Sequence, residues 1–184
     1  MAISTISQAG LDAPITLTSP VIAGTPTGVG VLTSGTAVAS TSGTAINFTG
    51  IPSWVKRITV MLNSISTNGT SLFLIQIGAG SVETTGYVSG AASRAGETTS
   101  TAGFVLNPAG VAAQGFTGQN TITLMGSNLY VSSGLLPRAG TGGDGFGNMS
   151  AGTKTTSGTL DRVRITTVNG TDTFDAGSIN ILYE

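Results

Sequence analysis

The chain has 184 residues, enough for one domain with a sizeable core, and only 8% of them are charged, with a formal net charge of −1. It contains neither histidine nor cysteine, which excludes the common zinc sites, the Ser-His-Asp and Cys-His catalytic triads, and any disulfide framework. No basic patch and no apolar run of about 20 residues is present, so we expect neither a nucleic-acid partner nor insertion into a membrane.

The first 34 residues are apolar and spaced by prolines. Pro14, Pro20 and Pro26 lie six residues apart, and proline disfavours helix at the residue before it. The segment is also rich in aliphatic residues, unlike most disordered tails. We therefore predict an extended N-terminal arm over residues 1–34, either a floppy terminus or an arm that becomes ordered on a neighbouring subunit, followed by one β-sandwich domain over residues 35–184.

Two apolar alternations follow each other in the first half of the domain. One face of the first carries Ile58, Val60 and Leu62, and one face of the second carries Phe73, Ile75 and Ile77. Such alternation is typical of half-buried strands. Asn68-Gly69 stands between them, which predicts a tight hairpin turn with positive φ at both residues.

The chain's single tryptophan, Trp54, precedes Lys56 and Arg57, which form its only Lys-Arg pair. These residues indicate either a ligand-binding site or the start of a strand. The second interpretation is favoured, because charges at the rim of a sheet stay in water.

The rest of the chain continues the same pattern. Gly126-Ser127-Asn128 separates Ile122 and Leu124 from Leu129 and Val131, and near the C-terminus Asn169-Gly170 predicts a second tight turn between Val163 and Ile165 on one strand and Ile179, Ile181 and Tyr183 on the last. Residues 88–103 and 134–152, rich in Gly, Ser and Ala, are predicted to be loops. Many strands without helices predict an all-β fold, a jelly-roll-like β-sandwich.

Two segments resemble a known kind of protein. STSGTAINFTGIPSWVKRITVMLNSISTNGTSLFLIQIG, within residues 34–87, closely resembles a segment common in tail-fibre and other virion proteins of tailed bacteriophages. SGTLDRVRITTVNGTDTFDAGSINILYE, within residues 153–184, resembles the C-terminal end of the same module. The two segments cover about half of the chain, and residues 88–152 match weakly.

The resemblance implies a structural protein located in the virion. Its role would be that of a fibre or tail-appendage subunit involved in attachment to the host surface, and capsid decoration, as a cement protein of the phage head, is the alternative. It also implies a homotrimer, and the N-terminal arm would bind other virion proteins.

The residues that carry chemistry form no convincing catalytic or metal site. Gly140, Gly142 and Gly145 fit G-x-G-x-x-G but lack the strand-then-helix frame of a phosphate cradle. Asp172 and Asp175 lie in a turn, where Asp caps the backbone more often than it binds Ca²⁺. The eight acidic residues are scattered and offer no preferred pair for glycoside hydrolysis. We therefore expect no enzyme, no cofactor and no metal.

Binding to a host surface glycan is the ligand hypothesis that the sequence leaves open. Sugars bind against aromatic rings flanked by hydrogen-bonding side chains. The candidates expected outside the core are Tyr87, Arg94, Tyr130, Arg138 and Phe146. Ordinary packing or solvation is the alternative for each of them.

Overall fold

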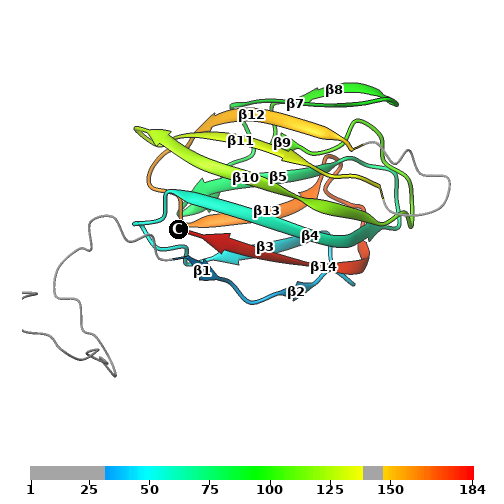
Figure 1. Cartoon of the computed structure of the whole chain (residues 1–184), viewed down its shortest axis with the longest axis horizontal. Coiled ribbons are helices and arrows are strands. Elements are labelled where there is room, and N and C mark those ends of the chain that lie inside the picture. The colour runs from blue at the N-terminus through cyan, green and yellow to red at the C-terminus, as the bar shows by residue number, and fades with distance from the viewer. Residues whose placement is uncertain (1–31, 139–146) are drawn as a thin grey trace, which may run out of the picture. The chain divides into compact units, whose positions relative to one another are not determined.

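The computed structural model describes residues 32–138 and 147–184, and over these residues the protein is all-β (Figure 1). The described residues form fourteen strands and no helix. In chain order the strands are β1 (Thr33–Ser34), β2 (Val38–Ala39), β3 (Ala45–Thr49), β4 (Arg57–Thr67), β5 (Phe73–Ala79), β6 (Ser81–Val82), β7 (Tyr87–Ser93), β8 (Gly96–Ser100), β9 (Phe104–Val105), β10 (Phe116–Gly126), β11 (Leu129–Leu135), β12 (Met149–Thr155), β13 (Arg162–Thr167) and β14 (Phe174–Tyr183).

The strands form two antiparallel sheets that pack face to face. The large sheet has the order β1-β14-β4-β10-β11-β12-β7-β8, with β2 also paired to β14, and the small sheet has the order β3-β13-β5-β6, with β9 also paired to β5. In Figure 1 the strands of the large sheet run side by side from β14 to β8, and β13 and β5 lie behind them. This arrangement confirms the predicted β-sandwich. The jelly-roll connectivity stays a prediction.

The core lies between the two sheets, and the alternation in the sequence predicts much of it. Ile58, Val60 and Leu62 of β4 are each at most 2% exposed, and they pack in one cluster with Val163 and Ile165 of β13. The predicted buried faces of these two strands are therefore confirmed. In β5 both faces are buried, because Leu74 packs with Val105 of β9 in a second, smaller cluster.

The two predicted Asn-Gly hairpins are wrong. β4 belongs to the large sheet and β5 to the small one, and β13 and β14 are divided in the same way. Residues 68–72 and 168–173 are therefore crossovers between sheets. Neither Asn68 nor Gly69 has a positive φ, and in the second pair only Gly170 does, at 67°. Strand alternation specifies which face is buried, but not which sheet the next strand joins.

The two crossovers bind each other instead of closing hairpins. The Asn68 Oδ1 atom accepts a hydrogen bond of 2.9 Å from the Thr173 backbone N–H, and the Asn68 N–H donates to the Thr173 carbonyl at 3.0 Å. The Asp172 carboxylate accepts from the Ser71 N–H at 2.9 Å. A Cβ atom on Gly69 would lie 2.1 Å from Asp172 Oδ2, so Gly69 is required by the approach of the other crossover.

The two-residue turn with positive φ at both positions is Ser127-Asn128, with φ values of 47° and 61°. It joins β10 to β11, which pair directly. The sequence placed a turn here but without glycine at either central position. Two positive φ values match the type I′ geometry of tight hairpins.

The prediction of loops over residues 88–103 and 134–152 is wrong where the structure describes them. These ranges hold most of β7, all of β8 and the first residues of β12, while residues 139–146 lie outside the described residues. Small residues have low strand propensity, yet here they let strands approach closely. A Cβ atom on Gly152 of β12 would lie 2.6 Å from the Val88 carbonyl oxygen of β7.

The predicted arm falls mostly on residues 1–31, which lie outside the described residues. Its last two residues, Thr33 and Ser34, form β1 and pair with Tyr183 and Leu182 of β14.

Candidate functional site

The usual polarity of a half-exposed sheet is partly reversed on β7, β11 and β12. An antiparallel sheet normally turns its apolar side chains toward the core and its polar side chains toward water. Here the inward side chains include Ser89, Ser132, Ser150 and Lys154, each at most 9% exposed. The outward side chains include Val88 at 73% exposure, Met149 at 61%, Leu135 at 54% and Val131 at 39%.

Strand register gathers these outward residues into one surface. Val131, Thr153 and Val88 lie opposite one another across β11, β12 and β7, and so do Leu135, Met149 and Ala92 four residues further along. Between these two rows lies a third row of small residues. We call this surface the outer face; it consists of Val88, Gly90, Ala92, Val131, Ser133, Leu135, Met149, Ala151 and Thr153. None of these nine residues is charged.

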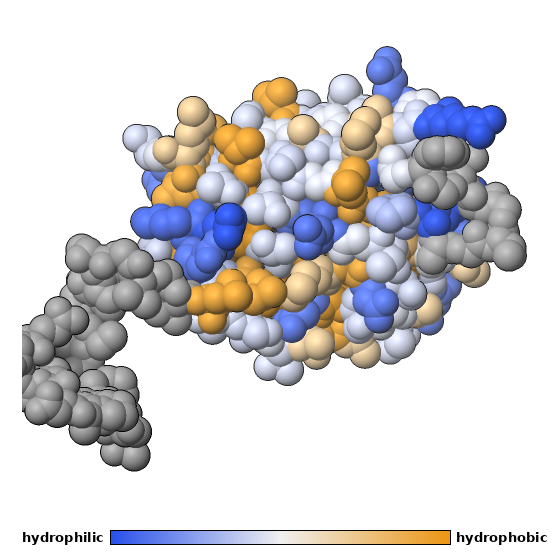
Figure 2. Space-filling view, in the orientation of Figure 1, coloured by the Kyte–Doolittle hydropathy of each residue, from blue (hydrophilic) through white to orange (hydrophobic). Residues whose placement is uncertain are grey.

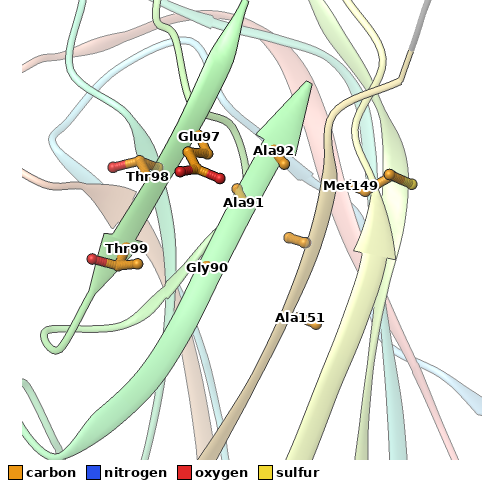
Figure 3. A pocket seen from close by; sticks show the side chains of 9 residues that line it. Gly90, Ala91, Ala92, Glu97, Thr98, Thr99, Met149 and Ala151 are labelled. Atoms are coloured by element: carbon orange, nitrogen blue, oxygen red, sulfur yellow. The ribbon is translucent and has the colours of Figure 1, made fainter. Parts of the chain in front are cut away.

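The outer face is uneven. A depression of about 620 Å³ lies over β7, β8 and the start of β12, lined mostly by small residues. Figure 3 shows Glu97 of β8 and Met149 of β12 on either side of Ala92. The space-filling view shows hydrophobic residues as separate orange patches among paler residues (Figure 2). Protruding and recessed apolar groups on one surface suit contact with another protein surface.

Hydrogen bonds explain why the polar side chains point inward. Ser132 Oγ donates to Asn120 Oδ1 at 2.7 Å, and Asn120 Nδ2 donates to Ser150 Oγ at 3.2 Å. These bonds link β11, β10 and β12 beneath the sheet. Among the described residues no buried side-chain nitrogen or oxygen is without a hydrogen-bond partner, so the reversed polarity is satisfied internally.

This network also corrects the sequence-based assignment of β11. Leu129 and Val131 were expected to be its core residues, but Tyr130 is 4% exposed and Val131 is 39% exposed. The Tyr130 hydroxyl accepts a bond from the Leu160 N–H at 3.3 Å, and its burial raises the pKa of that hydroxyl. Apolar periodicity alone could not show that Tyr130 and Ser132 have partners inside.

A buried ion pair lies at the inner side of the same strands. The Lys154 ammonium is 2.6 Å from the Glu83 carboxylate, with side-chain exposures of 8% and 17%, and 5.4 Å from the centre of the Tyr87 ring. The Ser157 N–H and hydroxyl also donate to Glu83, at 2.7 and 2.8 Å. Burial alone would raise the pKa of Glu83, but these hydrogen bonds outweigh it and hold the pKa below its usual value.

The tyrosine beside this pair is equally enclosed. The Tyr87 hydroxyl accepts from the Ile77 N–H at 2.7 Å and lies 2.9 Å from the Glu83 carbonyl. Burial raises the pKa of this hydroxyl far above its usual value. Lys154 and Glu83 neutralise each other, and the cluster ties the segment before β7 to β12.

The four sequence-predicted binding residues that the structure describes do not gather in one place. Tyr87 and Tyr130 are 1% and 4% exposed, so the expectation that they lie outside the core is wrong, and neither ring presents a face to a ligand. Both lie beside Lys154 in the strand register. Arg94 is exposed in the turn between β7 and β8, Arg138 lies after β11 opposite Phe116, and Phe146 lies outside the described residues.

Trp54, Lys56 and Arg57 behave as the start of a strand. Arg57 opens β4 and forms an ion pair with Glu184. Trp54 is 47% exposed, and its ring centre is 5.9 Å from that of Tyr183. This corner is thus held by contacts with the last residues of the chain.

Other candidate chemistries find no support in the described residues. Asp172 receives hydrogen bonds from the crossovers, and Ser66 donates to Asp175. No group of three or more acidic residues in the described ranges is placed to hold a metal ion. The same ranges contain no helix with the length and apolar character needed to cross a membrane. The glycines of the G-x-G-x-x-G pattern lie outside the described residues.

Sequence reasoning missed the outer face. Its signal was present in MSAGTKT and YVSGAAS, where residues of one alternate set are apolar or small and uncharged, but the low strand propensity of these stretches indicated loops. Comparisons with family models, with curated proteins and with solved structures found no significant match to this chain. The likeness to phage virion proteins therefore stays a prediction.

Proposed function

We propose that this chain is a structural protein of the virion of a tailed bacteriophage, a fibre or tail-appendage subunit that takes part in attachment to the host surface. The proposal starts from the resemblance of residues 34–87 and 153–184 to such proteins. Its role is mechanical and adhesive: a rigid β-sandwich that presents surfaces to other proteins or to host glycans, without catalysis.

One observation carries the proposal. The two resembling segments are separated by about a third of the chain, yet their strands are direct neighbours. β13 lies between β3 and β5 in the small sheet, and β14 pairs with β4 in the large one. The two segments therefore make one continuous two-sheet body, as expected if they belong to a single module.

The weakly matching residues 88–152 have a distinct place in this body. They supply β8, β10, β11, nearly all of β7 and the start of β12, which extend the large sheet beyond β4, together with the short β9 of the small sheet. A common body with a variable extension suits a family whose members attach to different targets.

Electron microscopy of virions labelled with an antibody against the chain tests the proposal. In a phage that encodes the chain, we expect label on the tail or its fibres, and deletion of the gene should lower adsorption to host cells. Label on the head would instead indicate capsid decoration. Unlabelled virions would contradict a virion role of either kind.

The predicted role of the N-terminal arm is tested separately. Deleting residues 1–31 leaves every described strand intact, because the first one begins at Thr33. We expect an unchanged melting temperature for the purified protein and a lower copy number in virions. A normal copy number would show that other residues make the attachment.

A further inference from the structure

The outer face has the composition of a surface that is covered in the working state of the protein. Four of the exposed large apolar side chains of the described residues lie on it: Val88, Val131, Leu135 and Met149. Polar side chains of the same strands are turned inward and bonded there. Large apolar side chains that stay in water cost free energy unless another surface covers them.

We propose that the outer face is a contact surface between copies of this chain. The occupant is a second copy, which buries the outer face together with its neighbours on β10 and β8. This inference goes beyond the proposed function, because it concerns the purified chain and does not depend on a virion role.

Charge is the first reason for choosing a second copy. The nine residues of the outer face carry no charge, so the face does not repel another copy of itself, whereas an acidic or basic partner would gain nothing there. At the rim, the exposed Arg94 and Glu97 lie at the same end of β7 and β8 with opposite charges. Two copies can therefore bring each of these charges near its opposite.

The chemistry of the face disfavours a sugar. None of its nine residues is aromatic, while sugar binding relies on aromatic rings. Its hydrogen-bonding side chains are limited to Ser133 and Thr153, which are too few to surround a sugar. An apolar surface on which small residues lie between larger ones suits interdigitation with the side chains of another sheet instead.

Area is the second reason. Neighbouring strands lie about 4.8 Å apart and residues rise about 3.3 Å along a strand. The five strands from β10 to β8, over the seven residues of β7, β11 and β12, therefore span a plane of roughly 550 Å² before the relief of the side chains is counted. Standard interfaces bury about 800 Å² on each partner. The planar value falls below this standard and close to the about 600 Å² per partner of weaker specific contacts, so the face suits a reversible contact between copies.

The test compares self-association of the wild-type chain with that of two matched variants. Val88→Lys places a charge on the outer face, and Val168→Lys places one at another exposed valine, between β13 and β14; the two valines are 73% and 52% exposed. We expect the wild type to have a mass above the 18.2 kDa of one chain in sedimentation equilibrium. Val88→Lys should weaken association at least about tenfold, and Val168→Lys should leave it unchanged.

A labelling experiment covers the case in which Val88→Lys disturbs folding. The chain has no cysteine, so Ala151→Cys and Val168→Cys each provide a single thiol. Alkylation of Ala151→Cys should slow as protein concentration rises, and that of Val168→Cys should not. The proposal would be overturned if the wild-type chain kept a mass of 18.2 kDa. It would also be overturned if a folded Val88→Lys variant associated as tightly as the wild type, or if rising protein concentration slowed the alkylation of both thiols equally.

Discussion

Glycine is required at position 69 because another part of the chain lies very close to it, and not because of its backbone angles. The Asp172 carboxylate occupies the space that a side chain would need, and it is fixed there by the Ser71 N–H and by Asn169 Nδ2, which donates at 2.6 Å. Any residue with a Cβ must displace a short side chain that is held by two hydrogen bonds.

We therefore predict that Gly69→Ala lowers the free energy of unfolding by about 1–2 kcal/mol. The same change should have less than half of that effect when Asp172 is already alanine, because the obstructing carboxylate is gone. Urea unfolding of the two single variants and the double variant measures this coupling. Equal effects in both backgrounds would show that backbone freedom, and not Asp172, requires the glycine.

The Lys154–Glu83 pair makes the free energy of unfolding depend on pH in the acidic range. A carboxyl whose pKa is lower in the folded chain than in the unfolded chain stabilises the fold above the unfolded value, and this contribution is lost as pH falls through the folded value. For Glu83 the loss begins near its ordinary pKa of 4.5 and continues below it.

We predict that Glu83→Gln costs about 3 kcal/mol at neutral pH, because it leaves the buried Lys154 charge without its partner. The difference in stability between wild type and variant should shrink as pH falls below 4.5. Arg57→Gln is the control, since Arg57 is 54% exposed in its own ion pair, and it should cost less than about 1 kcal/mol. A difference that does not change with pH would contradict this account.

At the scale of elements, the hairpin of β10 and β11 turns on two residues with positive φ, of which Ser127 is strained for its type. Ser127 and Asn128 both have positive φ, and Ser has little preference for that region. The Asn128 carbonyl accepts a bond from the Thr156 N–H at 3.0 Å. This backbone contact does not depend on which side chain occupies the turn.

We expect the replacement of Ser127-Asn128 by Asn-Gly to stabilise the protein by roughly 0.5–1 kcal/mol, because both residues favour the type I′ turn. Asn128→Val should have the opposite effect, since a β-branched residue is strained at positive φ. Thermal melting of both variants tests this. If residues 127–128 formed a looser loop instead of a tight turn, neither change would shift the melting midpoint.

At the scale of the whole molecule, scarce charge bears on the proposed self-association. Only 8% of the residues are charged, and the outer face has none. Salt screens charges but leaves apolar contacts largely intact. We predict that the dissociation constant for self-association changes by less than about threefold between roughly 0.05 and 0.5 M NaCl. A steep rise with salt would point to the charged rim as the main contact.

The sequence by itself determined the all-β class, the exclusion of zinc sites and His-dependent triads, and the buried faces of β4 and β13. These conclusions rest on local properties: residue types, and an alternation of period two that holds wherever a strand pairs. The likeness of residues 34–87 and 153–184 to virion proteins also came from the sequence, as did the proposed function.

Only the tertiary structure decided which sheet each strand joins, that Asp172 meets Gly69, and that Ser89, Ser132 and Lys154 point inward. Asn68-Gly69 looks like a hairpin turn until Thr173 and Asp172 are brought beside it. Tyr130 looks exposed until Leu160 supplies its partner. These outcomes depend on contacts between residues far apart in the chain, whose energies no local pattern records.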